Sequence, residues 1–238
     1  MSGRALRTRT SLATSPCAPS AGPVSLLSHD NKGVCVSTTN DASHEEGSSS
    51  VRILPLAKEP FQAPTDRDML PSERRRFVET HRTCVFGYGR RSDGPAMSVV
   101  YYVPAENGDL LVATMGERAK AKAVARNSKV SLCVLDETWQ FAYLQVYCDA
   151  VLDPDSETLV DVMMAVAERM SGVALDPELR PAVKAMGEEE GRVLVRCQPY
   201  ATFVTPPRHL HRSDQEERLT HWISASMPWD APDTPDEG

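Results

Sequence analysis

The stretch Leu110–Val134, LLVATMGERAKAKAVARNSKVSLCV, predicts more of the fold than any other part of the chain. It begins with an apolar run over Leu110–Thr114 and breaks at Met115–Glu117. A basic segment with helical character follows over Arg118–Arg126, and a second apolar run follows over Val130–Leu135. This order predicts a strand, a turn, a helix and a second strand.

The basic residues stand at the start of the predicted helix. A helix N-terminus has unpaired N–H groups and a partial positive charge, so it attracts phosphate. Arg118 and Lys120 stand where they could complete such a site. The alternative is a solvated basic helix face between two core strands, and the charge pattern alone leaves both interpretations open.

Composition limits the classes of function. The chain has 238 residues, of which 41% are hydrophobic and 25% charged, which is typical of one soluble domain with or without tails. A net charge of -7 argues against general nucleic-acid binding, and no apolar run is long enough to span a membrane. No CxxC pair occurs, so we expect reduced thiols in a cytoplasmic protein; the cysteines are Cys17, Cys35, Cys84, Cys133, Cys148 and Cys197.

The two ends differ from the middle of the chain. Residues 1–62 are rich in Ser, Thr and Pro and show no sustained period of 2 or 3.6, which predicts a disordered N-terminal extension. A disordered tail, a start codon assigned too early and an organelle transit peptide all fit this composition. Removal of the residues before about Phe61 is then expected to leave stability unchanged. Residues 213–238 are expected to form a partly disordered tail.

The folded domain is expected over residues 66–212. Pro71 suits the first turn of a helix over Glu73–His81, and Asn107–Gly108 marks a hairpin turn. Further strands are predicted at Thr83–Tyr88, Met97–Val103, Phe141–Leu152, Arg192–Gln198 and Tyr200–Thr205, the last two separated by Pro199. Two more helices are predicted, one from the N-cap Asp153 through Ser171 to a closing Gly172, and one over Glu178–Met186. This order predicts a mainly β protein with helices (α+β), in which six or seven antiparallel strands form a small closed or split barrel.

Common catalytic motifs are absent. The chain has no GxGxxG after a strand, no GxxxxGK[ST], no HExxH and no GxSxG. His209 and His211 form an isolated HxH pair without further ligands at metal-binding spacing, so no metal site is expected. No spacing of Ser, His and Asp indicates a hydrolytic triad, and no catalytic acid–base residue is assigned.

An ordered set of features lies within residues 70–207. The set consists of Asp93-Gly94-Pro95, Ser98, Tyr102, Leu110-Leu111-Val112, Thr114, Glu117-Arg118-Ala119-Lys120, Val130-Ser131-Leu132, Arg192-Val193-Leu194-Val195 and Pro199. Together these features resemble the pyridoxamine 5′-phosphate oxidase-like family of FMN- and F420-binding split barrels. The Arg-Ala-Lys form, with Trp139 and Tyr143 after it, resembles the branch that uses the deazaflavin coenzyme F420. The pyridoxamine oxidase branch usually has an Arg-Lys pair there.

The resemblance implies a split β-barrel that forms a homodimer with a cofactor at each interface. Arg118, Ala119 and Lys120 would hold the cofactor phosphate. Tyr143 and Gln145 would reach the ring system or the substrate from the partner subunit. The ring would lie on two strands, against Met97, Ser98, Val99, Ala113 and Thr114. Two positions depart from the family pattern: Ala123 replaces a frequent Asn, and Cys148 replaces a usual Gly.

The chemistry implied is that of the cofactor, which makes the missing acid–base pair expected. The primary hypothesis is an oxidoreductase that uses reduced coenzyme F420 for hydride transfer to an unsaturated small molecule. The first alternative is an FMN-dependent oxidase or reductase of the same fold, and the second is a non-catalytic flavin-binding protein. Lys122, Arg126 and the pair Arg90-Arg91 could form a groove for the acidic tail of coenzyme F420.

Overall fold

The computed structural model describes residues 51–64, 68–136, 142–204 and 226–233. The chain divides into two compact units, and the first of them, Met1–Glu45, lies outside the described residues. Residues 1–50 of the predicted extension (residues 1–62) and the HxH pair at His209 and His211 therefore also lie outside them. The second unit, Glu46–Gly238, contains every element discussed below.

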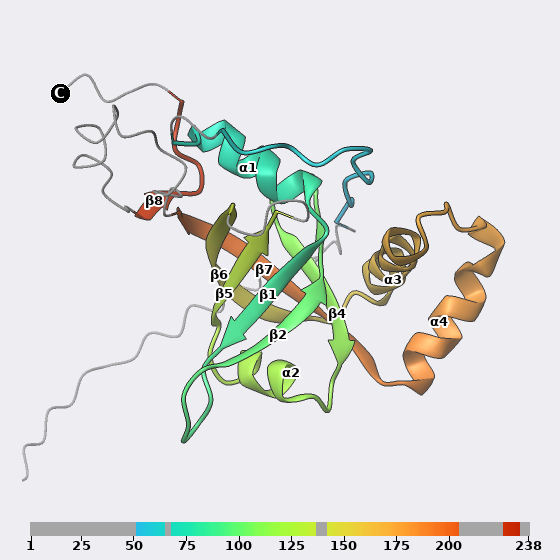
Figure 1. Ribbon diagram of the computed structural model, residues 1–238. Helices are drawn as coiled ribbons and strands as arrows, with labels where there is room; N and C mark the ends of the chain where they lie inside the picture. The colour runs from blue at the N-terminus through green and yellow to red at the C-terminus, as the bar shows by residue number, and fades with distance from the viewer. Residues whose placement is uncertain (1–50, 65–67, 137–141, 205–225, 234–238) are drawn as a thin grey trace, which may run out of the picture. The chain divides into compact units, whose positions relative to one another are not determined.

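One antiparallel sheet forms the body of this unit (Figure 1). Its strand order is β2-β1-β5-β6-β7-β4-β3, and the short β8 pairs with β7. No ladder joins β2 to β3 or β4 among the described residues, so the curled sheet is a half-open barrel. This confirms the predicted split-barrel fold with flanking helices. The strands are β1 (Thr83–Tyr88), β2 (Ala96–Tyr101), β3 (Val103–Pro104), β4 (Leu110–Met115), β5 (Lys129–Leu135), β6 (Tyr143–Asp153), β7 (Arg192–Phe203) and β8 (Ser226–Pro228).

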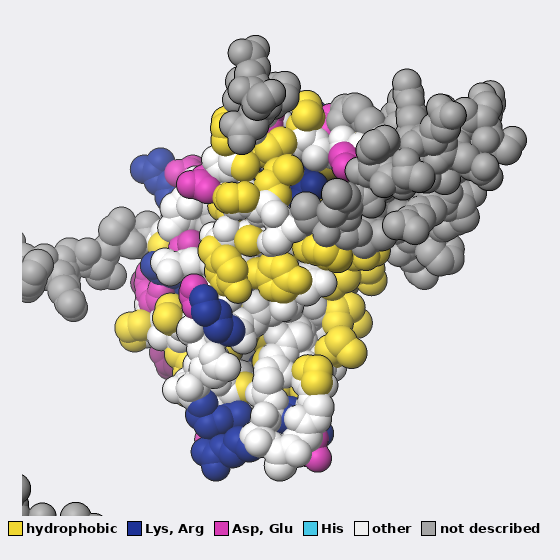
Figure 2. Space-filling model, turned by 90° about the vertical axis from the view of Figure 1, so that its left-hand side faces the viewer, with side chains coloured by type: hydrophobic (Ala, Val, Ile, Leu, Met, Phe, Trp, Pro, Cys, Tyr) yellow, Lys and Arg dark blue, Asp and Glu magenta, His cyan; other side chains and the backbone are white. Residues whose placement is uncertain are grey.

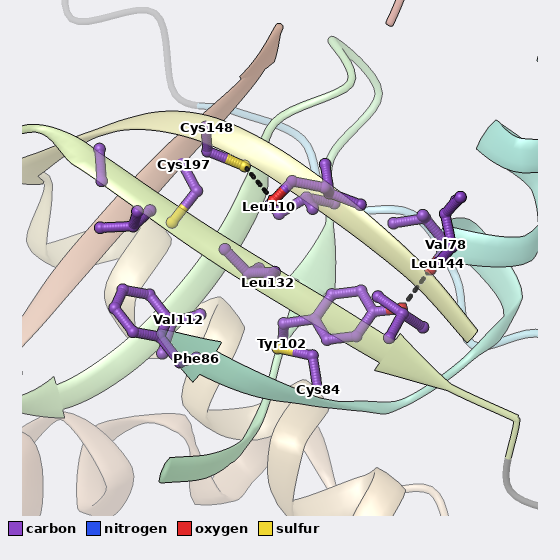
Figure 3. Packing of buried hydrophobic residues seen from close by; sticks show 14 of the residues in the cluster. Val78, Cys84, Phe86, Tyr102, Leu110, Val112, Leu132, Leu144, Cys148 and Cys197 are labelled. Atoms are coloured by element: carbon purple, nitrogen blue, oxygen red, sulfur yellow. Dashed lines mark hydrogen bonds between the residues drawn. The ribbon is translucent and has the colours of Figure 1, made fainter. Parts of the chain in front are cut away.

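The concave face of the sheet holds the core (Figure 3). Successive strand residues point to opposite faces, and on β5 and β6 every second side chain is buried. The Tyr102 hydroxyl donates to the Val78 carbonyl of the first helix and links that helix to the sheet. Three of the predicted reduced thiols, Cys84, Cys148 and Cys197, lie in this core, where burial raises their pKa.

The helices follow their sequence signals with one difference. Pro71 opens α1 (Pro71–Thr80), and α2 (Ala119–Val124) is the short basic helix. The helix α3 (Ser156–Ser171) ends at Gly172 with φ 71°, but its N-cap is Asp155, not Asp153 as the sequence predicts. The Asp155 carboxylate accepts the N–H groups of Glu157 (3.0 Å) and Thr158 (3.1 Å), whereas Asp153 pairs with Arg196. The short 3₁₀ turn η1 (Pro177–Leu179) leads into α4 (Arg180–Glu189).

The last long strand is continuous where the sequence predicts two. Pro199 lies within β7 opposite Cys148, next to the point where the register of β6 shifts between Tyr147 and Cys148. A proline has no N–H for the ladder, and an irregularity in the pairing tolerates it. The predicted break is therefore a local bulge between two strands that stay paired.

Two segments that the sequence assigns to the extension and the tail lie against the sheet. Leu54 N–H donates to the Pro104 carbonyl (2.8 Å), and Phe61 N–H donates to the Thr80 hydroxyl (2.8 Å). The Ile53 side chain packs against the cluster of Val103, Ala105, Leu111, Val162 and Leu194. At the other end, β8 extends the sheet, and Arg75 donates to the carbonyls of Trp229 (2.9 Å) and Ala231 (3.1 Å). Backbone hydrogen bonds and apolar contacts with the sheet and with α1 hold these segments, where local patterning gives no signal.

We therefore expect the two parts of the N-terminal region to differ in a truncation series. A chain that starts at Val51 should keep its free energy of unfolding, because it keeps these contacts. A chain that starts at Thr65 should lose about 2–4 kcal/mol, because it loses backbone hydrogen bonds and buried apolar area. Urea denaturation of both chains measures the difference, and equal stabilities would show that residues 51–64 contribute nothing.

Candidate cofactor site

A groove of about 330 Å³ lies between the two strand edges that the sheet leaves apart. On one side it is lined by Val99, Val100 and Tyr101 of β2, and on the other by Ala113, Thr114 and Met115 of β4. This volume lies at the lower end of the range for small-molecule sites. The opening of the barrel is thus a place where a small molecule could bind.

Both strand edges at the groove carry unused backbone groups. Within the described residues β2 pairs only with β1, and β4 pairs with β3 only at Leu110 and Leu111. Beyond Leu111 this edge of β4 has no neighbouring strand, although β7 pairs with its other edge. Alternate N–H and C=O groups of such an edge point away from the ladder. A planar ligand with hydrogen-bonding edges could bind these groups.

The lining is positively charged. Arg118, Lys120 and Arg192 line the groove, and no Asp or Glu is among the described residues that do. Arg192 donates through Nε to the Glu190 carboxylate (2.6 Å), so its charge is partly balanced from outside the groove. Neither Arg118 nor Lys120 makes an ion pair with a carboxylate of the described chain. The groove therefore favours an anionic ligand.

Lys120 has the most unusual environment of the three cations. It is only 8% exposed, and its Nζ lies 5.9 Å from the centroid of the Phe86 ring. Burial, and next the neighbouring Arg118 charge, lowers the pKa of Lys120. A buried ammonium group without a counter-ion costs free energy, and structures normally pair it. An anion bound beside Lys120 would supply the missing charge.

Ser98 is a second polar group whose partner is missing. Its Oγ is buried and makes no hydrogen bond with the described protein atoms. Ser98 lies opposite Phe86 in the β1–β2 ladder, and the Lys120 ammonium lies over the same ring. A buried hydroxyl without a partner is uncommon in folded proteins. A ligand that accepts hydrogen bonds at this end of the barrel would satisfy both groups.

The groove collects half of the residues predicted to hold the cofactor. Val99, Ala113, Thr114, Arg118 and Lys120 line it, and the structure brings them together from β2, β4 and the start of α2. The other five do not line it: Met97, Ser98, Ala119, Tyr143 and Gln145. Met97 is 72% exposed on the outer face of β2, and Ala119 is exposed at the start of α2.

Tyr143 and Gln145 lie on the outer face of β6, away from the core. Gln145 is paired with Cys133 of β5, which is paired with Val85 of β1, which is paired with Val99 of β2. Partners directly opposite in an antiparallel sheet point to the same side. A row of side chains therefore runs across the outer face from Gln145 to Val99, at the margin of the groove. Within one chain, no described contact brings Gln145 into the groove itself.

Helices α3 and α4 contribute a wall of the groove that was not predicted from the sequence. Five apolar side chains from α3 and α4 line the groove: Met163, Val166, Ala167, Met170 and Met186. The sequence of α3 has a broad apolar face, but a helix that only packs on a sheet has a face of the same width. Exposure in the folded protein distinguishes the two kinds of residue on this helix: Met170, which lines the groove, is 66% exposed, whereas Val162, which belongs to the core, is buried.

The cations proposed for the acidic tail of coenzyme F420 lie outside the groove lining. Lys122 pairs with Glu117 (2.6 Å) and Arg90 pairs with Asp93 (2.7 Å), both at exposed positions. Arg126 donates to the Lys122 carbonyl (2.6 Å). These local partners do not prevent tail binding, but they weaken the case for it compared with Arg118 and Lys120.

No group of three or more His, Cys, Asp or Glu side chains in the described residues could hold a metal ion. No helix in that part of the chain is long and apolar enough to cross a membrane.

A search of curated proteins finds no match to the chain. Solved structures similar to this chain include a conserved hypothetical protein from Mycobacterium tuberculosis (21% identity, 74% of this chain and 98% of that chain, TM-score 0.49). They also include an F420 reductase (23%, 52% and 91%, TM-score 0.38). A third is a putative pyridoxamine 5′-phosphate oxidase from Listeria innocua (18%, 51% and 86%, TM-score 0.36).

The family model described as pyridoxamine 5′-phosphate oxidase matches residues 70–203, which include every strand of the barrel except β8. This match confirms the resemblance found in the sequence. The chain therefore belongs to the pyridoxamine 5′-phosphate oxidase family.

Proposed function

We propose that the protein is an oxidoreductase that binds reduced coenzyme F420 at the barrel opening and reduces an unsaturated small molecule. The observation that carries the proposal is the largely buried Lys120 side chain, which has no carboxylate partner within the described chain and lines a groove in which the described residues include no acidic side chain. Lys120 and the neighbouring Arg118 suit the phosphate that coenzyme F420 and FMN share.

The chain's own residues would bind, orient and shield the cofactor. Arg118 and Lys120 would hold the phosphate, and Thr114 with the free edges of β2 and β4 would contact the ring system. When bound, the reduced coenzyme supplies a hydride, and a proton from solvent completes the reduction of a double bond. The apolar wall of the groove would exclude water from the reacting atoms.

The Arg118-Ala119-Lys120 pattern favours coenzyme F420 over FMN in this proposal. Visible absorbance and mass spectrometry of the small molecule released from the purified protein test that preference. FMN in the released fraction would support the FMN-dependent alternative. Bound cofactor without turnover of any unsaturated acceptor would support a flavin-binding protein without catalysis.

The first prediction concerns Lys120, whose replacement should weaken cofactor binding without destabilising the cofactor-free protein. Lys120→Met keeps the buried volume and removes the charge, so cofactor affinity should fall roughly ten- to a hundredfold. The cofactor-free protein should unfold at the same or a higher denaturant concentration, because an unpaired buried charge is lost. Fluorescence titration and urea denaturation measure the two effects.

Lys122→Met is the matched control, because Lys122 lies two residues away on the same helix but is exposed and paired with Glu117. It should leave affinity for FMN, which lacks the acidic tail that Lys122 could contact, within about twofold, as expected for an exposed side chain away from the phosphate. Equal losses of affinity in the two variants would point to general attraction by the basic helix. Unchanged affinity in Lys120→Met would return this segment to a solvated helix.

The second prediction is a pH dependence of cofactor affinity. Burial lowers the pKa of Lys120 in the free protein, and a bound phosphate would raise it. The affinity for the cofactor should therefore be highest at a pH below the pKa of Lys120 in the free protein. It should decline as the pH rises towards the pKa of Lys120 in the complex. Titrations between about pH 7 and pH 10 keep the phosphate fully ionised throughout. Lys120→Arg keeps its charge over this range, so a decline that persists in that variant would exclude Lys120 as its source.

We also propose that the protein is a homodimer, joined through the outer face of the sheet. Met97 (72% exposed) and Val99 (73% exposed) lie side by side on the outer face of β2, with Val85 and Cys133 opposite Val99 across the ladders. Figure 2 shows one face of the molecule on which hydrophobic side chains form a broad band, with Lys and Arg gathered below it. A second copy on this face would bring its Tyr143 and Gln145 towards the groove.

Sedimentation equilibrium tests this assembly. The wild-type protein should be a dimer at micromolar concentration, and Met97→Glu should weaken the dimer at least about tenfold, because it places a charge in an apolar interface. Leu179→Glu is the control, since Leu179 is similarly apolar and 45% exposed but lies in η1. A monomeric wild-type protein would remove the roles proposed for Tyr143 and Gln145.

A further inference from the structure

The hairpin of α3 and α4 is an insertion between two paired strands of the barrel. It joins β6 to β7, which are paired directly, so the sheet does not need it for its hydrogen bonds. Figure 1 shows α3 beside β4, with α4 on its far side. Arg180 of α4 pairs with Glu157 (2.8 Å) and Asp161 of α3, and Lys184 pairs with Glu157 (2.7 Å). These ion pairs hold the two helices together as one unit.

The packing of this hairpin directs methionine side chains into the groove. Met163 is nearly buried, and a Cβ added at Gly187 of α4 would lie 3.2 Å from its sulfur, so the two helices approach closely at this point. Met170 and Met186 are 66% and 44% exposed although both line the groove. Such large exposed apolar side chains at a concave surface are typical of binding sites.

The charged and the apolar side chains that line the groove come from different elements. Arg118 and Lys120 lie at the start of α2, whereas α3 and α4 contribute only apolar side chains to the lining. Methionine side chains are flexible and polarisable, so they adapt to apolar ligands of different shapes. A groove of about 330 Å³ fits a small molecule and is too small for a folded partner.

We propose that the α3–α4 hairpin selects the substrate, and that Met163, Met170 and Met186 bind the hydrocarbon part of an apolar unsaturated molecule. This inference rests on the proposed function, in which the phosphate of the cofactor occupies the end at Arg118 and Lys120. The reducible double bond of the substrate would then face the ring system, which contacts the free edges of β2 and β4. The substrate class is an electron-poor alkene with an alkyl or polycyclic apolar portion.

A homologous series measures the contribution of the wall. The probes are cyclohex-2-enone and its 3-methyl, 3-butyl and 3-hexyl derivatives, which share one reducible group and differ only in apolar length. Calorimetric titration of the cofactor-loaded protein gives a dissociation constant for each, and turnover with reduced coenzyme F420 gives kcat/KM. Burial of each CH₂ should tighten binding by about fourfold, up to the length that the wall covers.

The test variant is Met170→Gln combined with Met186→Gln, which keeps side-chain length and removes apolar surface at two exposed positions. Its dependence on alkyl length should fall below about twofold per CH₂, and circular dichroism of the variant checks that its fold is intact. The control is Met164→Gln, because Met164 is on the same helix but lines a separate hollow with Ile53 and Glu168. It should keep the wild-type dependence.

The outcomes separate this inference from the proposed function. A length dependence in binding that disappears in the double variant supports the methionine wall, even if no probe is turned over, and that combination would contradict only the proposed reaction. Wild-type binding that is independent of alkyl length would overturn the inference. An equal length dependence in the double variant and the wild type would overturn it as well.

Discussion

The barrel of this protein is not closed by hydrogen bonds, and the candidate site depends on that opening. In the described chain β2 pairs only with β1, and the edge of β4 beyond Leu111 has no neighbouring strand. An open edge exposes backbone donors and acceptors that require a partner. Here the two edges face a groove instead of a further strand. The core on the concave face, with Phe86, Leu132 and Leu144 fully buried, holds those edges in place.

The charges around this opening favour an anion. Lys120 is buried next to Arg118, and burial lowers its pKa without any carboxylate in the groove lining to compensate. An arrangement selected for stability alone would pair or expose such a charge. The Ser98 hydroxyl without a partner belongs to the same end of the barrel. Polar groups without partners in the described chain gather at this place, and a bound ligand could supply those partners. Groups perturbed in this way often mark a binding site.

The inserted hairpin gives the groove its second chemical character. Its two helices are held together by Arg180 and Lys184 on one side and by the close approach of Gly187 to Met163 on the other. It also contacts the barrel directly, because Arg169 donates to the Tyr102 carbonyl at the β2–β3 junction. A rigid insertion of this kind can vary its lining side chains without disturbing the sheet. Substrate choice and cofactor binding can therefore reside in different elements.

The amino-acid sequence determined the elements whose signals are local. The alternating strands, Pro71 at the first turn of α1, Gly172 after α3 and the basic start of α2 follow from periodicity and backbone preference, and the order of these elements carried the family resemblance. Tertiary structure alone decided what depends on long-range pairing. It kept β7 continuous through Pro199, because a bulge next to Cys148 tolerates the missing N–H, and it ordered residues 51–64 by pairing them with the sheet edge. It also brought Met170 and Met186 into the lining of one groove with Lys120, because the helices that carry them pack beside the open edge of the sheet.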